Sequence, residues 1–174
     1  PFLISIVVVS YLVYGFLSTD AGFINNSILK PMGKEAIGWY SNAKYWPFIL
    51  IFVNIWKNLG YNCIIYYATV VGLDASLYES ASIDGANRWQ KIKNIIWPTI
   101  KPTTTILLIM NLGNVLNSDY TKILLMQNDT NRSQLEVIGT FVYQKGIVEG
   151  KFSYATAVNL FISVIGFALV FGAN

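Results

Sequence analysis

The chain has 174 residues, a net charge of +3, one cysteine and no histidine. Charged residues make up 12% of the chain and apolar residues 54%, whereas soluble domains usually carry about 25% charged residues. The composition argues against an ordinary soluble domain and against nucleic-acid binding. A single cysteine, Cys63, excludes an internal disulfide, and the lack of histidine excludes Ser-His catalysis, Cys-His catalysis and His-metal sites. We therefore expect no catalytic residue, metal or cofactor.

Four apolar stretches predict membrane-spanning helices in one all-α domain, a polytopic membrane helix bundle. They cover residues 2–17, 46–73, 103–117 and 154–174. A spanning helix needs about 20 residues at roughly 1.5 Å each. Both ends of the chain fall within apolar runs, so we expect a fragment whose first span is completed by residues before Pro1. The alternative, a helical core of a large soluble protein, is disfavoured by four such stretches in so short a chain.

The connections between these stretches differ in character. Residues 18–45 and 119–153 are polar and rich in turn residues, and the aromatic residues near 39–46 are expected to anchor at the membrane interface. Residues 74–102 instead predict two short helices joined at a hinge. We expect Asp74 to cap the first helix and Asp84 the second. The second helix should end at Pro98, after apolar residues at helical spacing: Trp89, Ile92, Ile95 and Ile96.

The hinge segment carries a motif in fixed register. Residues 79–98 read Glu-Ser-Ala-Ser-Ile-Asp-Gly-Ala-Asn-Arg-Trp-Gln-Lys-Ile-Lys-Asn-Ile-Ile-Trp-Pro. This segment closely resembles the loop signature of binding-protein-dependent ABC importer permeases. Ser80, Ile92 and Trp97 depart from the usual residues but keep small or large apolar character. The positions that match are Glu79, Ala81, Asp84, Gly85, Ala86, Ile95, Pro98 and Pro102.

Two further segments narrow the resemblance. Residues 55–61 and 152–166 are similar to oligosaccharide permeases of the maltose-transporter class, closest to the polysaccharide or aldouronate type of Gram-positive bacteria. The resemblance covers nearly the whole chain and implies a type I importer permease of about six spans, of which four are present. Counting Lys and Arg leaves the orientation undecided. The resemblance places residues 74–102 in the cytoplasm, with 18–45 and 119–153 outside, in a multi-pass protein of the bacterial cytoplasmic membrane.

The resemblance also implies partners and a mechanism. The subunit would pair with a second, usually different permease in the bilayer, bind two cytoplasmic ATPase subunits and receive an oligosaccharide from an extracytoplasmic solute-binding protein. The loop would act as a lever: Gly85 permits the turn, Ala81 and Ala86 allow close approach, and Glu79 pairs with a basic residue of the ATPase. Trp89 and the isoleucines after it would anchor the lever to the permease. The chain itself lacks the Gly-x-x-x-x-Gly-Lys-Ser/Thr phosphate loop.

Polar residues within two of the stretches are candidates for the substrate path. Asn54 and Asn58 share a helical face, with Lys57 at its edge. An ionisable residue at this depth indicates a functional site, although hydrogen bonding between helices explains the asparagines equally well. Asn111 and Asn114 repeat the pattern in the third stretch, where a neighbouring helix or the partner permease is the alternative contact.

Two other classes of protein fit the sequence less well. An ion-coupled secondary transporter would place carboxylates in its spans, yet none of the nine acidic residues lies inside one. A membrane-embedded enzyme would need a catalytic set, which the residue types of this chain do not supply. Both remain alternatives to the ATP-driven importer.

Overall fold

The computed structural model describes residues 1–117 and 119–173, which form helices and connections without a β-strand. The longer helices are α1 (Ile6–Leu17), α2 (Trp46–Val71), α3 (Ala75–Ile83), α5 (Trp97–Gly113) and α9 (Phe152–Ala173). The shorter ones are η1 (Ile24–Leu29), η2 (Ala43–Tyr45), α4 (Arg88–Lys91), η3 (Ile92–Ile96), α6 (Tyr120–Met126), α7 (Arg132–Leu135), α8 (Ile138–Tyr143) and η4 (Gln144–Val148).

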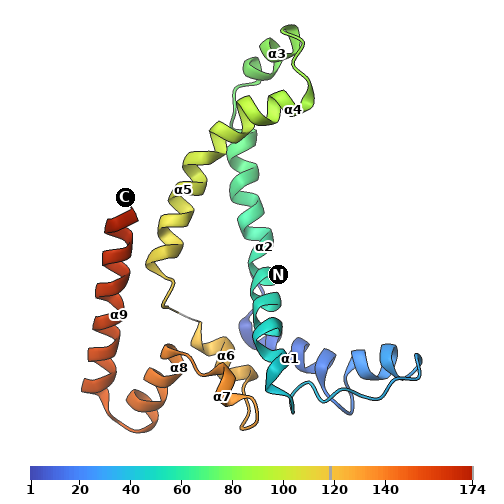
Figure 1. The fold of residues 1–174 in the computed structure, drawn as a ribbon, viewed down its shortest axis with the longest axis vertical. Coiled ribbons are helices and arrows are strands. Elements are labelled where there is room, and N and C mark those ends of the chain that lie inside the picture. Colours follow the sequence, from blue (N-terminus) through green and yellow to red (C-terminus); the bar gives the residue numbers. More distant parts are fainter. Residues whose placement is uncertain (118, 174) are drawn as a thin grey trace.

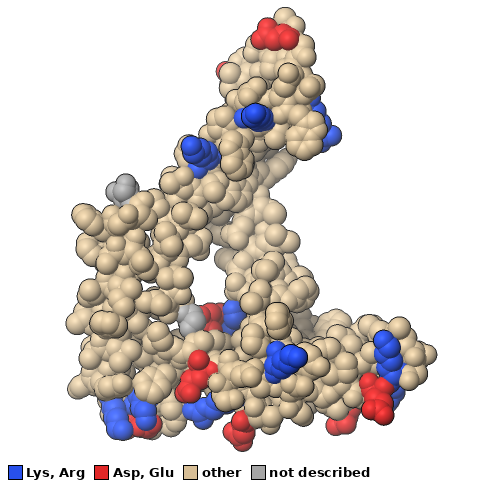
Figure 2. All heavy atoms as spheres, in the orientation of Figure 1, with Lys and Arg blue, Asp and Glu red and all other residues tan. Residues whose placement is uncertain are grey.

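The helices divide the molecule into a long middle section and two ends. Figure 1 shows α2, α5 and α9 running along the long axis, with α3 and α4 at one end. The remaining helices, including α1, η1 and α6 to α8, gather at the opposite end. The connections 18–45 and 119–153 therefore lie together, far from the hinge segment. Figure 2 shows charged side chains mainly at these two ends, with a mostly uncharged section between them.

The packed core lies at the end where α1 meets α2, α6 and α7. Trp46, at the start of α2, is fully buried, and its indole N–H donates to the carbonyl of Trp39 at 3.1 Å. Burial, together with the nearby Tyr14, raises the pKa of Tyr40 to about 12. The expectation that Trp46 anchors at the membrane interface is wrong, because its ring belongs to this core. The other buried members of the core are Val9, Val53, Ile123, Met126 and Leu135.

The long helices keep most of their apolar surface exposed. Among the described residues, two segments are long and apolar enough to cross a membrane: 43–71, with a mean hydropathy of 1.4, and α9, with 2.1. At 12 residues, α1 is shorter. On α9, Phe161 and Phe167 are 67% and 72% exposed. A helix that is apolar on its exposed faces is stable only against lipid or another protein surface, which agrees with the membrane setting predicted from sequence. The four-span boundaries remain a prediction.

The helix after the hinge does not end at Pro98. Helical structure continues through α4, η3 and α5, with Pro98 in the first turn of α5 and Pro102 inside it. Proline lacks the N–H that would bond the carbonyl four residues earlier. The wider π-helical turn of η3 accommodates this loss, since the N–H of Trp97 reaches the carbonyl of Ile92, and the Thr99 hydroxyl donates to the carbonyl of Ile95 at 2.8 Å. The prediction of a helix end at Pro98 is wrong for this reason.

Two glycines let α5 and α9 approach closely. A Cβ placed on Gly166 would lie 2.7 Å from the carbonyl oxygen of Gly113, and one on Gly113 would lie 2.8 Å from a methyl of Val170. Small residues at a crossing are the usual means by which membrane helices pack without a hydrophobic driving force. The crossing fixes α9 to the end of the helix that begins at the hinge.

Candidate functional site

The first helix of the hinge segment begins as predicted. Asp74 is its N-cap, and the carboxylate accepts a hydrogen bond from the Ser76 N–H at 3.0 Å. This hydrogen bond lowers the pKa of Asp74. Three residues separate the end of α2 from the start of the capped helix, α3, so the chain leaves one long helix and enters the hinge segment almost at once. We call residues 74–91 the coupling hairpin.

Gly85 makes the turn of the coupling hairpin. Its φ of +73° lies in the left-handed region, and no atom beyond its neighbours lies within 4 Å of a Cβ built there. Its N–H donates to the carbonyl of Ser82 at 3.1 Å, while that of Ala86 donates to Ala81 at 2.9 Å. These two bonds form the Schellman motif that ends a helix at a left-handed residue. The sequence prediction of a hinge at Gly85 rests on the same property.

The second helix is capped by Asn87 rather than Asp84. The Asn87 side chain accepts from the Gln90 N–H at 3.0 Å, and the Gln90 side chain accepts from the Asn87 N–H at 2.7 Å. This reciprocal pair is a capping box. Asp84 is instead the C-cap of α3, so the prediction that it caps the second helix is wrong. The spacing Asn-x-x-Gln was the sequence signal that identifies the correct cap.

One direct bond closes the coupling hairpin. The Lys91 ammonium, on α4, donates to the Ser82 hydroxyl of α3 at 2.6 Å. On the outside, Glu79 is exposed, and in residues 1–117 and 119–173 its carboxylate has no ion-pair partner. Ala81 and Ala86 are half-buried. The coupling hairpin therefore has a fixed shape and carries an uncompensated carboxylate.

Two large apolar side chains of the coupling hairpin are more exposed than the sequence analysis predicted. Trp89 is 79% exposed and Ile83 is 86% exposed. The expectation that Trp89 anchors the lever against this chain is therefore wrong. Ile92, Ile95 and Ile96 are half-buried, as anchoring residues would be. Because η3 and α5 continue the helix from Arg88 to Gly113, a displacement of α4 is carried directly into a long helix.

A second group of polar side chains lies on α2, towards the other end. The Asn58 amide donates to the carbonyl and side-chain oxygens of Asn54, at 2.9 and 3.3 Å. The Lys57 ammonium donates to the carbonyls of Phe2 and Ile4 at 2.9 and 2.6 Å. Lys122, from α6, reaches the Asn54 side chain at 2.9 Å. Sequence reasoning did not identify Lys122. We call Asn54, Lys57, Asn58 and Lys122 the polar cluster.

The asparagines of the third stretch are not part of this cluster. Asn111 and Asn114 donate to carbonyls one turn earlier in the chain, those of Leu107 at 2.8 Å and Met110 at 3.0 Å. No hydrogen bond joins either of them to the polar cluster in the part of the chain that the structure describes. Both remain exposed. The structure thus brings together the α2 candidates and leaves those of α5 apart.

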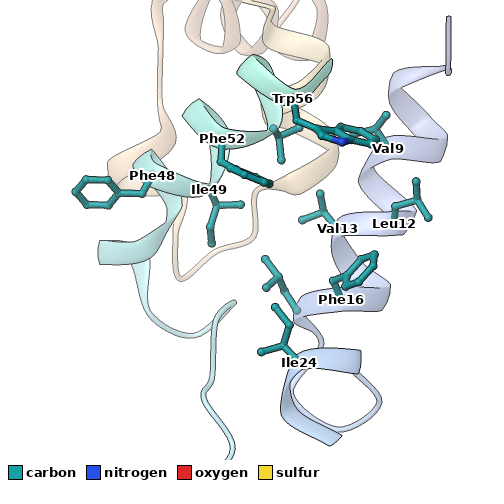
Figure 3. A pocket seen from close by; sticks show the side chains of 11 residues that line it. Val9, Leu12, Val13, Phe16, Ile24, Phe48, Ile49, Phe52 and Trp56 are labelled. Carbon is teal, nitrogen blue, oxygen red and sulfur yellow. The ribbon is translucent and has the colours of Figure 1, made fainter. Parts of the chain in front are cut away.

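A pocket of about 540 Å³ lies between α1, η1 and α2. Figure 3 shows Val9 and Val13 of α1 facing Phe52 and Trp56 of α2 across it. Apart from the indole of Trp56 its lining side chains are apolar, so it offers few groups to hydrogen-bond a sugar. Amide and ammonium groups lie instead in the polar cluster.

Comparison with known proteins identifies the family. The description "binding-protein-dependent transport system inner membrane component" matches residues 1–173. The chain belongs to this family. The fold agrees with this assignment. One chain in the crystal structure of a bacterial alginate ABC transporter, in complex with alginate pentasaccharide-bound periplasmic protein, superposes on this chain with a TM-score of 0.91 and 37% sequence identity. The match covers 100% of this chain and 60% of that chain. The predicted all-α permease fold is confirmed.

Two relatives from Bacillus subtilis (strain 168) match along the whole chain. Protein LplB is 37% identical over 174 residues, and so is YteP, a polygalacturonan/rhamnogalacturonan transport system permease. The chain spans about half the length of these curated relatives, 54% of each. The family assignment favours the importer over the secondary transporter, and it makes this chain a permease component of an inner-membrane transport system, not an enzyme.

Proposed function

We propose that this chain is part of the membrane-spanning subunit of an ATP-driven oligosaccharide importer and that the coupling hairpin is the contact for a separate ATPase. The observation that carries the proposal is the continuous helix from Arg88 to Gly113, which links the coupling hairpin to α5. A push on α4 moves α5, and the close glycine crossing passes the motion to α9.

The same proposal assigns roles to the motif residues. Glu79 offers an exposed carboxylate to a basic residue of the ATPase, and Gly85 with Ala81 and Ala86 gives a compact turn that fits a groove. Asp84 ends α3, while Ile95 and Pro98 lie where the coupling hairpin passes into α5. The protein would be multi-pass in the bacterial cytoplasmic membrane. It would act with two ATPase copies, a second permease and an extracytoplasmic solute-binding protein.

The names of the relatives support a saccharide as the cargo. YteP and the alginate transporter are both described as carrying polysaccharides or their fragments. The polar cluster offers the amides and ammonium groups that bind sugar hydroxyls, so we propose that Asn54, Lys57 and Asn58 line the path. Asn111 and Asn114, on α5, would also line this path when substrate is present.

Co-purification of the full-length subunit with the ATPase encoded beside it tests the proposal. Glu79→Lys should abolish retention of the ATPase while membrane insertion is kept, because it reverses the exposed charge. Glu35→Lys is the matched control, since Glu35 is also exposed but belongs to the connection 18–45, which lies at the opposite end of the molecule. Equal retention by wild type and Glu79→Lys, or equal loss in both variants, would contradict the coupling role.

A further inference from the structure

A second pocket, with a volume of about 290 Å³, lies between α6, α8, η4 and the first turns of α9. Figure 1 shows α6, α8 and the start of α9 at the end of the molecule opposite the coupling hairpin. None of the residues that line this pocket belongs to the polar cluster. Small-molecule pockets usually measure roughly 300–1,000 Å³, so this one has room for one small ring and not for a whole oligosaccharide.

Two tyrosine rings form an aromatic surface in the pocket. Tyr120, on α6, and Tyr143, on α8, are stacked, with ring centroids 5.9 Å apart and planes 26° from parallel. Gly146 lets η4 approach α9 here, because a Cβ on it would lie 2.7 Å from that of Ala155. The face of an aromatic ring is electron-rich, so it attracts the weakly positive C–H hydrogens on the flat side of a sugar ring.

Several polar groups in the pocket are not used inside the fold. In the part of the chain that the structure describes, no hydrogen bond joins the side chains of Tyr120, Tyr143 or Asn159 to another protein group. The Thr156 hydroxyl donates to the carbonyl of Phe152 at 2.9 Å and can still accept a second bond. The pocket therefore combines an aromatic surface with free hydroxyl and amide groups, the combination that a ring bearing hydroxyls requires.

The lining of this pocket contains no charged residue. Lys145 lies between two lining residues in the sequence, but its ammonium is bonded to Glu149 at 2.6 Å, and Lys151 bonds the same carboxylate at 2.9 Å. A carboxylate that entered the pocket would lose its water without gaining a free cation, which costs far more than the burial of a bonded hydroxyl. The pocket therefore favours an uncharged ring.

We propose that this pocket is a binding site for one uncharged sugar ring of the oligosaccharide, separate from the polar cluster. The inference rests on the proposed function and adds a site to it. The ring would stack on Tyr120 and Tyr143, and its hydroxyls would bond the two phenols and the Asn159 amide. Because α6 and α8 belong to the connection 119–153, which the proposed function assigns to the outside of the membrane, this site would bind the sugar before it reaches the polar cluster.

The test uses the purified importer, with both permease subunits and both ATPases, in lipid nanodiscs that contain no glycolipid and without the solute-binding protein. The probes are methyl glucoside, methyl galactoside and the matched methyl uronides. Saturation-transfer NMR titrations give the Kd of each probe and identify the sugar protons nearest the protein. We expect a neutral glycoside to bind with saturation strongest on the C–H protons of one ring face, and its uronide to bind more weakly.

Two variants remove single polar groups from the pocket. Tyr143→Phe keeps the aromatic ring and loses the hydroxyl, while Asn159→Leu keeps the size of the side chain and loses the amide. Each should weaken binding of the neutral glycoside roughly two- to tenfold, as for the loss of one hydrogen bond. Tyr154→Phe is the matched control and should leave the Kd unchanged, because Tyr154 is exposed on the same helix, α9, and does not line the pocket.

Four results would overturn the inference. They are no binding of either neutral glycoside, a uronide that binds as tightly as its glycoside, wild-type affinity in both pocket variants, and an equal loss of affinity in Tyr154→Phe. Binding that survives both pocket variants but is lost in Asn58→Leu would place the ring in the polar cluster instead. An importer that fails this test but still takes up an oligosaccharide with ATP retains the proposed function.

Discussion

Gly85 offers a quantitative test of the coupling hairpin, because alanine there should disturb only the backbone. The left-handed conformation costs an L-residue roughly 1–2 kcal/mol. No atom lies within 4 Å of the added Cβ, so no clash increases this cost. The turn with φ of +73° should therefore be populated about 5 to 30 times less in Gly85→Ala. If the ATPase binds only this turn, its affinity should fall by the same factor.

The assay is titration of the solubilised full-length permease with its ATPase. Gly33→Ala is a matched control, because Gly33 has a φ of +70° and equally open surroundings, and it belongs to the connection 18–45 at the opposite end of the molecule. Gly85→Asn should lose less affinity than Gly85→Ala, since asparagine tolerates the left-handed region. Gly85→Pro should abolish binding, because proline fixes φ near −65° and removes the N–H that bonds Ser82.

Wild-type ATPase affinity in Gly85→Ala would contradict binding to this turn. An equal loss of ATPase affinity in Gly33→Ala would contradict it too, since the effect would then be general rather than local. Hydrogen exchange of residues 79–91 in the same variants reports directly on the coupling hairpin. Faster hydrogen exchange of these residues without a change in ATPase affinity would mean that the ATPase does not bind this turn.

Three further predictions concern stability. Gly166→Val should lower the melting temperature of the solubilised permease, because the added Cβ would lie 2.7 Å from a backbone oxygen and such overpacking costs about 1–3 kcal/mol. Gly172→Val is the control on the same helix: its Cβ has no atom within 4 Å, so the melting temperature should not change. Asn87→Ala should cost about 1 kcal/mol through the lost cap and speed hydrogen exchange in α4. Hydrogen bonds from Lys145 and Lys151 lower the pKa of Glu149, so these contacts hold residues 144–151 at neutral pH and are lost as the pH falls through that lowered pKa. Amide hydrogen exchange of residues 144–151 should therefore become faster at low pH. Glu149→Gln should remove this pH dependence.

The features predicted correctly from sequence are those that depend on neighbouring residues. Asp74 caps α3 because a short acidic side chain precedes an apolar run, and Gly85 turns the chain because it lacks a Cβ. The apolar stretches give α1, α2, α5 and α9 for the same local reason. The second cap was predicted wrongly as Asp84, because Asp and Asn side chains can accept the same bonds from a helix N-terminus. Only the glutamine three residues after Asn87 distinguishes them.

The proline error has a different cause. A proline usually breaks a helix because the ring removes one hydrogen bond and crowds the preceding turn. Here the preceding turn is π-helical, and the threonine hydroxyl after Pro98 supplies a bond to a nearby carbonyl. The coupling hairpin consequently joins α5 without a second hinge. The hydrogen-bonded turn at Gly85 and the continuous helix through Pro98 are both consistent with the coupling role proposed above.

Contacts between distant residues could not be read from the sequence at all. Lys122 bonds Asn54 across 68 positions, and nothing near Lys122 distinguishes it from a solvated loop charge. The sequence around Trp46 likewise predicts an interfacial aromatic residue, whereas in the structure α1, α6 and α7 enclose its ring. Both residues lie where the connections 18–45 and 119–153 pack around α2. Since Lys122 comes from one of those connections, movement of that end relative to α2 would lengthen or break its hydrogen bond to Asn54.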